Sequence, residues 1–177
     1  MSHSTIRGQT GLTLIEVLIV VILMGIIAAV AIPQFTTATT DAQNNALNAN
    51  LATLRTTVDL YAAQHNGRFP GQYLETTGAT VTTSDVIAAT AFVAQLTQYS
   101  DATGKVSLTK DPVLYPYGPY FRSGMPNNPL PASKNTVAAD FAILTTLVGT
   151  VAAGQGGWKV AVLTGQVIAN HAAYETR

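Results

Sequence analysis

The sequence predicts an α+β fold in which one long N-terminal helix packs on a small antiparallel sheet, accompanied by a second short helix. Three observations lead to this prediction: an uninterrupted apolar run near the start, an apolar stripe at helical spacing beyond it, and β-branched segments around Gly towards the C-terminus. Each of these elements has an apolar face that must be covered, so we expect helix and sheet to pack together.

Length and composition are those of one domain plus one anchoring segment. The chain has 177 residues, of which 47% are hydrophobic and 10% charged, against roughly 25% charged residues in an average soluble domain. Nine basic residues balance nine acidic ones, so no basic footprint for nucleic acid is visible. The absence of Cys excludes disulfides, thiolate metal sites and Cys nucleophiles.

The apolar run near the N-terminus is long enough to cross a bilayer. Residues 12–32 read LTLIEVLIVVILMGIIAAVAI, and at ~1.5 Å per residue they span the ~30 Å hydrocarbon layer. Only Glu16 is charged within this run. Residues 1–11 are short and polar with a single Arg7, as expected of a stretch that stays on the cytoplasmic side.

Three interpretations of this run compete. A secretory signal peptide could be cleaved after Ala29-Val30-Ala31, although apolar regions of signal peptides usually span only about 7–15 residues. A plain membrane anchor would be indifferent to Glu16. The third interpretation gives Glu16 a partner that neutralises it, and we favour it because an acid near the bilayer centre costs roughly 2.5–3.5 kcal/mol.

The start of the run resembles a known processing signal. Gly11 is followed by Leu-Thr-Leu-Ile-Glu at residues 12–16 and then by an unbroken apolar helix. This arrangement closely resembles the class III signal of type IV pilins and of type II secretion pseudopilins. The resemblance continues at Gly25 and at Pro33, which falls where helices of this family commonly carry a proline, and we predict a helix kink at these two residues.

This resemblance implies a processing and assembly route. A prepilin peptidase would cut between Gly11 and Leu12 and methylate the new Leu12 amine, and Glu16 would pair with the Leu12 amine of a neighbouring subunit. The chain departs from the family at Leu12, where Phe is most common, and at Thr10, where a basic residue is frequent.

The helical pattern is expected to continue past the membrane segment. Its apolar residues are spaced four, three, four and three apart: Leu47, Leu51, Leu54, Val58 and Tyr61. Pro33 would kink this helix or open its hydrogen-bond ladder without ending it. Asn66-Gly67 and Phe69-Pro70 supply the stop, giving one helix from Leu12 to His65 about 80 Å long.

The sequence thus divides into four predicted segments. Residues 1–11 form a leader peptide, residues 12–32 a transmembrane and polymerisation helix, residues 33–66 the periplasmic half of the same helix, and residues 67–177 a globular head.

Within the head, a second helix follows Thr83 or Ser84 as N-cap, with Asp85 in its first turn. Its expected apolar face comprises Val86, Ala89, Phe92, Val93, Leu96 and Tyr99. A turn at residues 100–104 and a short strand at Lys105–Thr109 come next.

The remainder of the head is predicted to form a loop and a sheet. Residues 111–135 hold most of the prolines and the aromatic cluster Tyr115, Tyr117, Tyr120 and Phe121, which is either a partner surface or, as we prefer, a lid on the core. A strand is expected around Phe141–Val148. Trp158–Val162 and Val167–Ala169 flank Thr164-Gly165 and predict a β-hairpin.

The head also resembles pseudopilins, less specifically than the N-terminus does. The matching stretches are the turn at residues 66–70, the proline-rich loop at residues 118–129 and the C-terminal hairpin. The resemblance implies a pilin-like fold. Type IV pilins commonly close a C-terminal loop with a disulfide, which a chain without Cys cannot form, so the major-pseudopilin branch is favoured.

The residues offer no catalytic constellation, and we predict no enzyme. His3, His65 and His171 match no metal-ligand spacing. Ser107–Lys110 matches S-x-x-K without the partner motifs of that chemistry, and the Gly-rich residues 154–157 do not form a dinucleotide fingerprint.

Calcium is the one cofactor that the resemblance brings up. Major pseudopilins bind Ca²⁺ near the C-terminal sheet, and Asp111 lies in the corresponding region, with Asp101 and Asp140 as further oxygen donors. The several clustered oxygens that Ca²⁺ requires are missing from the sequence, so we expect turn aspartates in water and predict no cofactor.

Together these features predict a structural subunit of a periplasmic pseudopilus of a type II secretion system. It would be a single-pass inner-membrane protein with a periplasmic head before assembly. Its partners would be other copies of itself, a prepilin peptidase and an inner-membrane assembly platform, without nucleic acid. The alternative is a type IV pilin for adhesion, motility or DNA uptake. From a different class, the chain could be a signal-anchored periplasmic binding module.

Overall fold

The computed structural model describes residues 12–81, 85–130, 136–140, 157–171 and 174, and these form an α+β chain as predicted. The elements in order are α1 (Leu14–Gln64), α2 (Asp85–Thr97), β1 (Tyr99–Ser100), β2 (Val106–Ser107), β3 (Val137–Asp140), β4 (Trp158–Ala161) and β5 (Gln166–Ala169). The chain divides into two compact units, Met1–Ala42 and Gln43–Arg177, and α1 contributes residues to both.

In the first unit, the described residues form the N-terminal part of α1, and nearly all of their side chains are exposed. It begins at Leu14, two residues after the predicted start, and continues through Pro33. It is the one helix among the described residues that is long and apolar enough to cross a membrane. The predicted leader and the predicted N-caps Thr83 and Ser84 lie outside the described residues.

In the second unit, the C-terminal part of α1 forms one wall of the core. The predicted stripe is confirmed, because each of its members is at most 2% exposed: Leu47, Leu51, Leu54, Val58 and Tyr61. The helix ends at Gln64, one residue before the predicted end. Asn66 and Gly67 then adopt positive φ angles of 58° and 79°, and the Gly67 N–H donates to the Ala62 carbonyl at 2.7 Å.

The main sheet has three strands in the order β3-β4-β5. The predicted hairpin is confirmed: β4 and β5 are antiparallel, with Trp158 opposite Ala169 and Ala161 opposite Gln166. The turn uses Gly165 at a φ of 70°, and an added Cβ there would collide with the Phe69 ring. Gly165 therefore both closes the hairpin and admits Phe69 against it.

The prediction of a purely antiparallel sheet is wrong, because β3 runs parallel to β4. Parallel neighbours need a connection of about a dozen residues or more, and residues 141–156 provide one of that length between β3 and β4. The predicted strand Phe141–Val148 lies outside the described residues, and β3 precedes it at Val137–Asp140.

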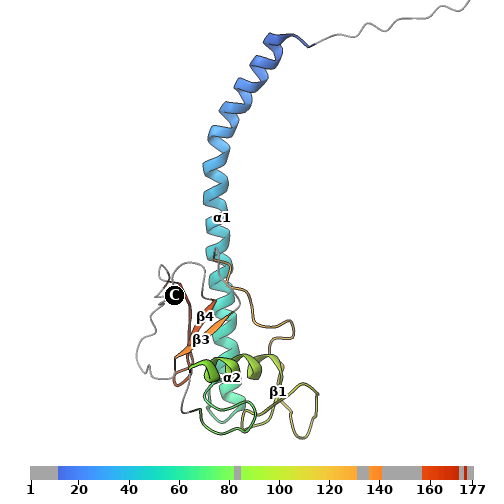
Figure 1. Ribbon diagram of the computed structural model, residues 1–177, viewed down its shortest axis with the longest axis vertical. Coiled ribbons are helices and arrows are strands. Elements are labelled where there is room, and N and C mark those ends of the chain that lie inside the picture. The colour runs from blue at the N-terminus through green and yellow to red at the C-terminus, as the bar shows by residue number, and fades with distance from the viewer. Residues whose placement is uncertain (1–11, 82–84, 131–135, 141–156, 172–173, 175–177) are drawn as a thin grey trace, which may run out of the picture. The chain divides into compact units, whose positions relative to one another are not determined.

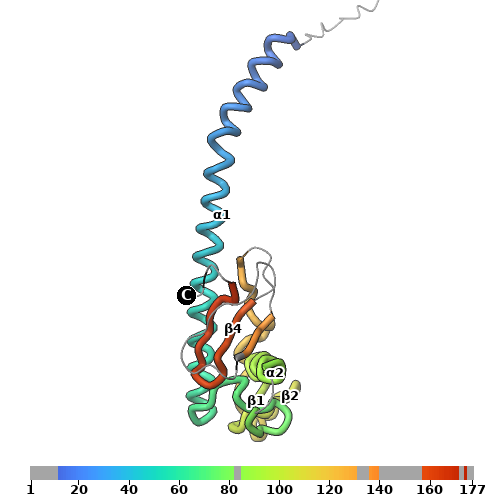
Figure 2. Tube along the Cα trace, turned by 60° about the vertical axis from the view of Figure 1, so that its left-hand side comes forward, coloured from blue at the N-terminus to red at the C-terminus, as the bar shows by residue number. Residues whose placement is uncertain are grey.

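A second, two-stranded sheet pairs β1 with β2 in antiparallel register, Tyr99 with Ser107 and Ser100 with Val106. The predicted strand Lys105–Thr109 is therefore reduced to two residues. Figures 1 and 2 show the C-terminal part of α1 with α2 and the three-stranded sheet beside it. Residues from α1, α2, β3, β4 and β5 share one hydrophobic cluster, so this helix–sheet packing is the core of the head.

Helix α2 departs from the predicted apolar face. Val86 is 74% exposed, whereas Gln95 is fully buried together with Phe92 and Leu96. The Gln95 side chain binds three backbone groups: its Nε2 donates to the carbonyls of Tyr73 (2.9 Å) and Gly104 (2.8 Å), and its Oε1 accepts from the Gly71 N–H (2.8 Å). A buried amide is thus retained in α2 because it satisfies backbone groups of two loops.

Replacing Gln95 by Leu is expected to destabilise the head by about 2–3 kcal/mol, because buried backbone groups lose their partners at roughly 1–3 kcal/mol for an unsatisfied group. Urea unfolding of the full chain in detergent, followed by pulse proteolysis, measures the change. Replacement of exposed Val86 by Ala on the same helix is the control and should shift the midpoint little. Equal stability of both variants would contradict a stabilising role for the Gln95 hydrogen bonds.

Candidate assembly site

The residues expected to carry processing and assembly lie at the beginning of α1. Leu12 is 77% exposed and precedes the helix, while Glu16 is the acidic residue of its first turn. Gly11, the predicted cleavage residue, lies outside the described residues. Glu16 is thus the charged residue in an otherwise apolar stretch, four residues after Leu12.

The first turn also contains a cap that was not predicted. The Glu16 N–H donates to the Thr13 side-chain Oγ1 at 3.4 Å and to the Thr13 carbonyl at 3.2 Å. Thr13 and Glu16 are three apart, the spacing of a Thr-x-x-Glu capping box, in which the acid sits at the third helical position. This short pattern could have identified the start of the helix, and it makes a local capping role a second candidate role for Glu16.

Between Leu14 and Ile32 the surface of α1 is apolar on every side apart from Glu16, and Phe35 follows shortly after. The large hydrophobic residues exposed there are Leu14, Ile15, Val17, Leu18, Ile19, Val20, Val21, Ile22, Leu23, Met24, Ile26, Ile27, Val30, Ile32 and Phe35. A helix that is hydrophobic all round requires lipid or other helices around it. The segment therefore has the surface of a membrane anchor or of a helix buried in an assembly.

Gly25 and Pro33 both lie inside this helix. A Cβ added at Gly25 would meet nothing within 4 Å, so packing within one chain does not require glycine there. Pro33 lacks the N–H that would bond the carbonyl four residues earlier. Just beyond it, the hydroxyls of Thr36 and Thr37 donate to the carbonyls of Ile32 (3.2 Å) and Pro33 (3.1 Å). The predicted kink at these two residues stays a prediction.

The structure shows the hydrogen bonds of two of the three candidate calcium ligands, Asp101 and Asp111. Asp101 Oδ1 accepts hydrogen bonds from the Thr103 N–H, the Thr103 hydroxyl and the Lys105 N–H, closing a turn. Asp111 Oδ1 accepts from the N–H groups of Val113 and Leu114, which lowers the pKa of the Asp111 carboxyl. Within the described part of the chain no three His, Cys, Asp or Glu side chains group together.

Asp140 ends β3, and its side chain lies outside the part of the structure that is described. The two remaining candidates have an established use in the fold: Asp101 and Asp111 bind backbone N–H groups that would otherwise be unpaired in tight turns.

The aromatic cluster of the proline-rich loop contributes to the core. Tyr120 and Phe121 are partly buried against the main hydrophobic cluster, and the Tyr120 hydroxyl donates to Gln64 Oε1 at 2.5 Å. Burial raises the pKa of Tyr120 well above its usual value. These two residues agree with the lid interpretation of the cluster.

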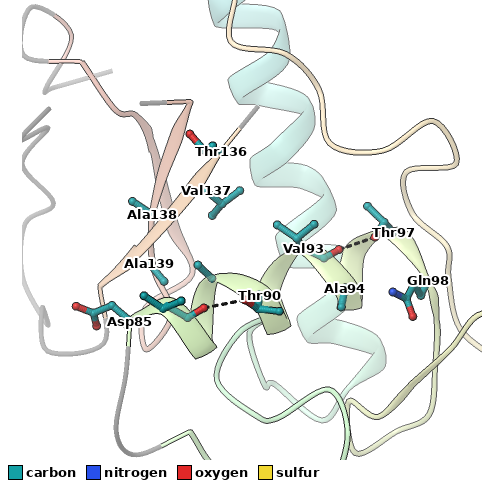
Figure 3. A pocket seen from close by; sticks show the side chains of 12 residues that line it. Asp85, Thr90, Val93, Ala94, Thr97, Gln98, Thr136, Val137, Ala138 and Ala139 are labelled. Carbon is teal, nitrogen blue, oxygen red and sulfur yellow. Dashed lines mark hydrogen bonds between the residues drawn. The ribbon is translucent and has the colours of Figure 1, made fainter. Parts of the chain in front are cut away.

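The described part of the head contains an open groove of about 700 Å³ between α2 and β3. Figure 3 shows its lining side chains, with Val93 and Thr97 from α2 facing Val137 across it. The hydroxyls of Thr90 and Thr97 donate to their own helix, to the carbonyls of Val86 (2.9 Å) and Val93 (2.7 Å). The lining is mainly apolar, and Asp85 is its charged residue. Such a lining offers a contact surface and does not contain the acid and base side chains that catalysis would need.

Comparison with known proteins bears on the N-terminal segment. Residues 6–32 match the family model described as the prokaryotic N-terminal methylation motif. Neither the curated proteins nor the solved structures contain a match to the chain. The matched stretch includes Gly11, Leu12 and Glu16. Together with the apolar helix, the match indicates a type IV pilin-like substrate of a prepilin peptidase, with the features of a structural subunit rather than of an enzyme.

Proposed function

We propose that this protein is a structural subunit of the periplasmic pseudopilus of a type II secretion system. The observation that carries the proposal is the methylation motif at residues 6–32, which overlaps the start of α1, where the helix surface between Leu14 and Ile32 is apolar apart from one acid, Glu16. Prepilin peptidase would release residues 1–11, and an inner-membrane assembly platform would add subunits through residues 12–32.

The physical argument for polymerisation starts from Glu16. An intramembrane acid without a partner is costly, and cleavage before Leu12 creates a cationic amine that can neutralise it. If the amine of one subunit meets the acid of the next, the contact is heterologous and does not close, so it generates a fibre. Before assembly the subunit would be a single-pass inner-membrane protein with its head in the periplasm.

The choice of pseudopilus over pilus rests on cysteine content. Type IV pilins commonly close a C-terminal loop with a disulfide, and this chain contains no Cys. A type IV pilin for adhesion, motility or DNA uptake is the alternative. Loss of the protein from its own cell should abolish export of secreted proteins while surface filaments persist; loss of surface filaments with intact secretion would favour the pilin.

The first test is the N-terminus of the mature protein. The full chain, expressed with a prepilin peptidase, is expected to begin at N-methyl-Leu12, as measured by intact mass and N-terminal sequencing. Expression without the peptidase, and a Gly11→Leu variant with it, should both give the uncleaved chain. A mature chain beginning at Ile32 would identify an ordinary signal peptide and overturn the proposal.

A further inference from the structure

His65 is a buried titratable residue to which the proposed filament assembly assigns no role. It follows the end of α1 and its side chain is fully buried. Its Nδ1 lies 2.8 Å from the Tyr61 carbonyl and its Nε2 lies 3.0 Å from the Ser100 hydroxyl. Since a carbonyl can only accept, Nδ1 carries the proton, and in the neutral ring Nε2 accepts from Ser100.

The imidazole also lies between two aromatic rings. It stacks on Tyr61 with centroids 3.7 Å apart and planes 6° apart, and the Tyr117 ring lies 5.0 Å away on a tilt. Tyr117 belongs to the proline-rich loop and Ser100 to β1, and these two residues exchange backbone hydrogen bonds of 3.0 and 3.1 Å. One side chain therefore contacts the end of α1, β1 and the loop together.

We propose that His65 is an acid-sensitive clasp: the neutral imidazole fastens β1 and the loop around Tyr117 to the end of α1, and its protonation releases them. Protonation places a charge in an enclosed position and turns Nε2 from acceptor into donor, so the Ser100 hydroxyl must find a new acceptor. The contacts described for the imidazole involve neither Trp158 nor the stripe residues Leu47 to Val58. We therefore expect this part of the core to stay folded when His65 is protonated.

The charges around His65 set the direction of the effect. Burial lowers its pKa below the usual value; the Tyr61 carbonyl and Asp101 act in the opposite direction, and Arg68 adds to the lowering. Tyr61 and Tyr117 face the ring, and burial keeps Tyr61 neutral by raising its pKa. Because the open state binds the proton more readily, the closed clasp loses stability as the pH falls below about 6.5.

Hydrogen exchange of the full chain in detergent micelles tests the clasp at pH 7.5 and 5.0, after correction for intrinsic exchange rates. The amides of Ser100 and Tyr117 report its opening, since each donates to the other's carbonyl. We expect their protection to fall several-fold at pH 5.0 while that of Val160 in β4 is unchanged. His171→Gln should behave like the wild type, and His65→Gln should remove the pH dependence.

Two outcomes would overturn the proposal. One is a loss of protection at pH 5.0 in His65→Gln as large as that in the wild type, because the acid effect would then come from another group. The other is independent of that variant's folding: an NMR titration of histidine-labelled wild-type chain in which the His65 imidazole titrates at or above pH 6.5. A midpoint below that value, together with opening around Tyr117, supports the clasp.

Discussion

Replacing Trp158 by Ala is expected to lower the free energy of unfolding of the head by about 3–5 kcal/mol, the usual cost of deleting a buried Trp or Phe side chain. Trp158 is fully buried and belongs to the main hydrophobic cluster. Its indole Nε1 also donates to the Pro126 carbonyl at 2.8 Å, which ties β4 to the proline-rich loop. Urea unfolding of the full chain in detergent, read out by pulse proteolysis, measures the loss.

A graded pair of variants separates packing from hydrogen bonding. Trp158→Phe keeps most of the ring volume but leaves the Pro126 carbonyl without its donor, so a smaller loss of about 1–3 kcal/mol is expected. Should Trp158→Ala destabilise the head no more than Trp158→Phe does, the core would not depend on the volume of this side chain.

Elements defined by short-range patterns could be predicted from the sequence. The buried stripe on α1 follows the helical period, so the spacing of its apolar residues suffices to name its members. The hairpin of β4 and β5 follows from two apolar segments around Thr164-Gly165, a turn that needs positive φ. In both cases the determining interactions lie within a few residues of one another.

Features that depend on distant contacts could not be predicted. The pairing of β3 with β4 joins segments separated by residues 141–156, and hydrophobic pattern does not specify whether such a pair is parallel. The buried side chains of Gln95 and His65 each make a hydrogen bond to a group far away in the sequence, the Gly71 N–H and the Ser100 hydroxyl. From residue type alone, Gln is expected at the surface and His at an intermediate position.

The candidate assembly site could also be predicted where its signal is contiguous in the sequence. The methylation motif is contiguous, so it can be recognised directly in the sequence. Helix α1 begins at Leu14 rather than Leu12 because Thr13 caps it, a local signal that is weaker than the family pattern around it. Glu16 consequently has two candidate roles, one within its own chain and one towards a neighbour.

Replacing Glu16 by Gln is expected to abolish filament assembly while leaving cleavage before Leu12 intact. Neutralising an intramembrane acid recovers roughly 2.5–3.5 kcal/mol per subunit. Without that gain the association constant between subunits should fall by about two orders of magnitude. The measurement is the sedimentable fraction of subunits in cells that express the assembly machinery, with intact mass recorded in parallel. Val20→Ala, one turn further along the exposed helix, is the control.

The choice of Gln distinguishes the two roles of Glu16. Gln at the third helical position still fits a capping box, so Glu16→Gln removes the charge and spares the helix start. Thr13→Val does the reverse, because it removes the cap and leaves the acid. If pairing with a neighbouring amine drives assembly, Glu16→Gln fails and Thr13→Val still forms filaments. The opposite pattern would mean that Glu16 serves its own helix, and the pairing would have to be abandoned.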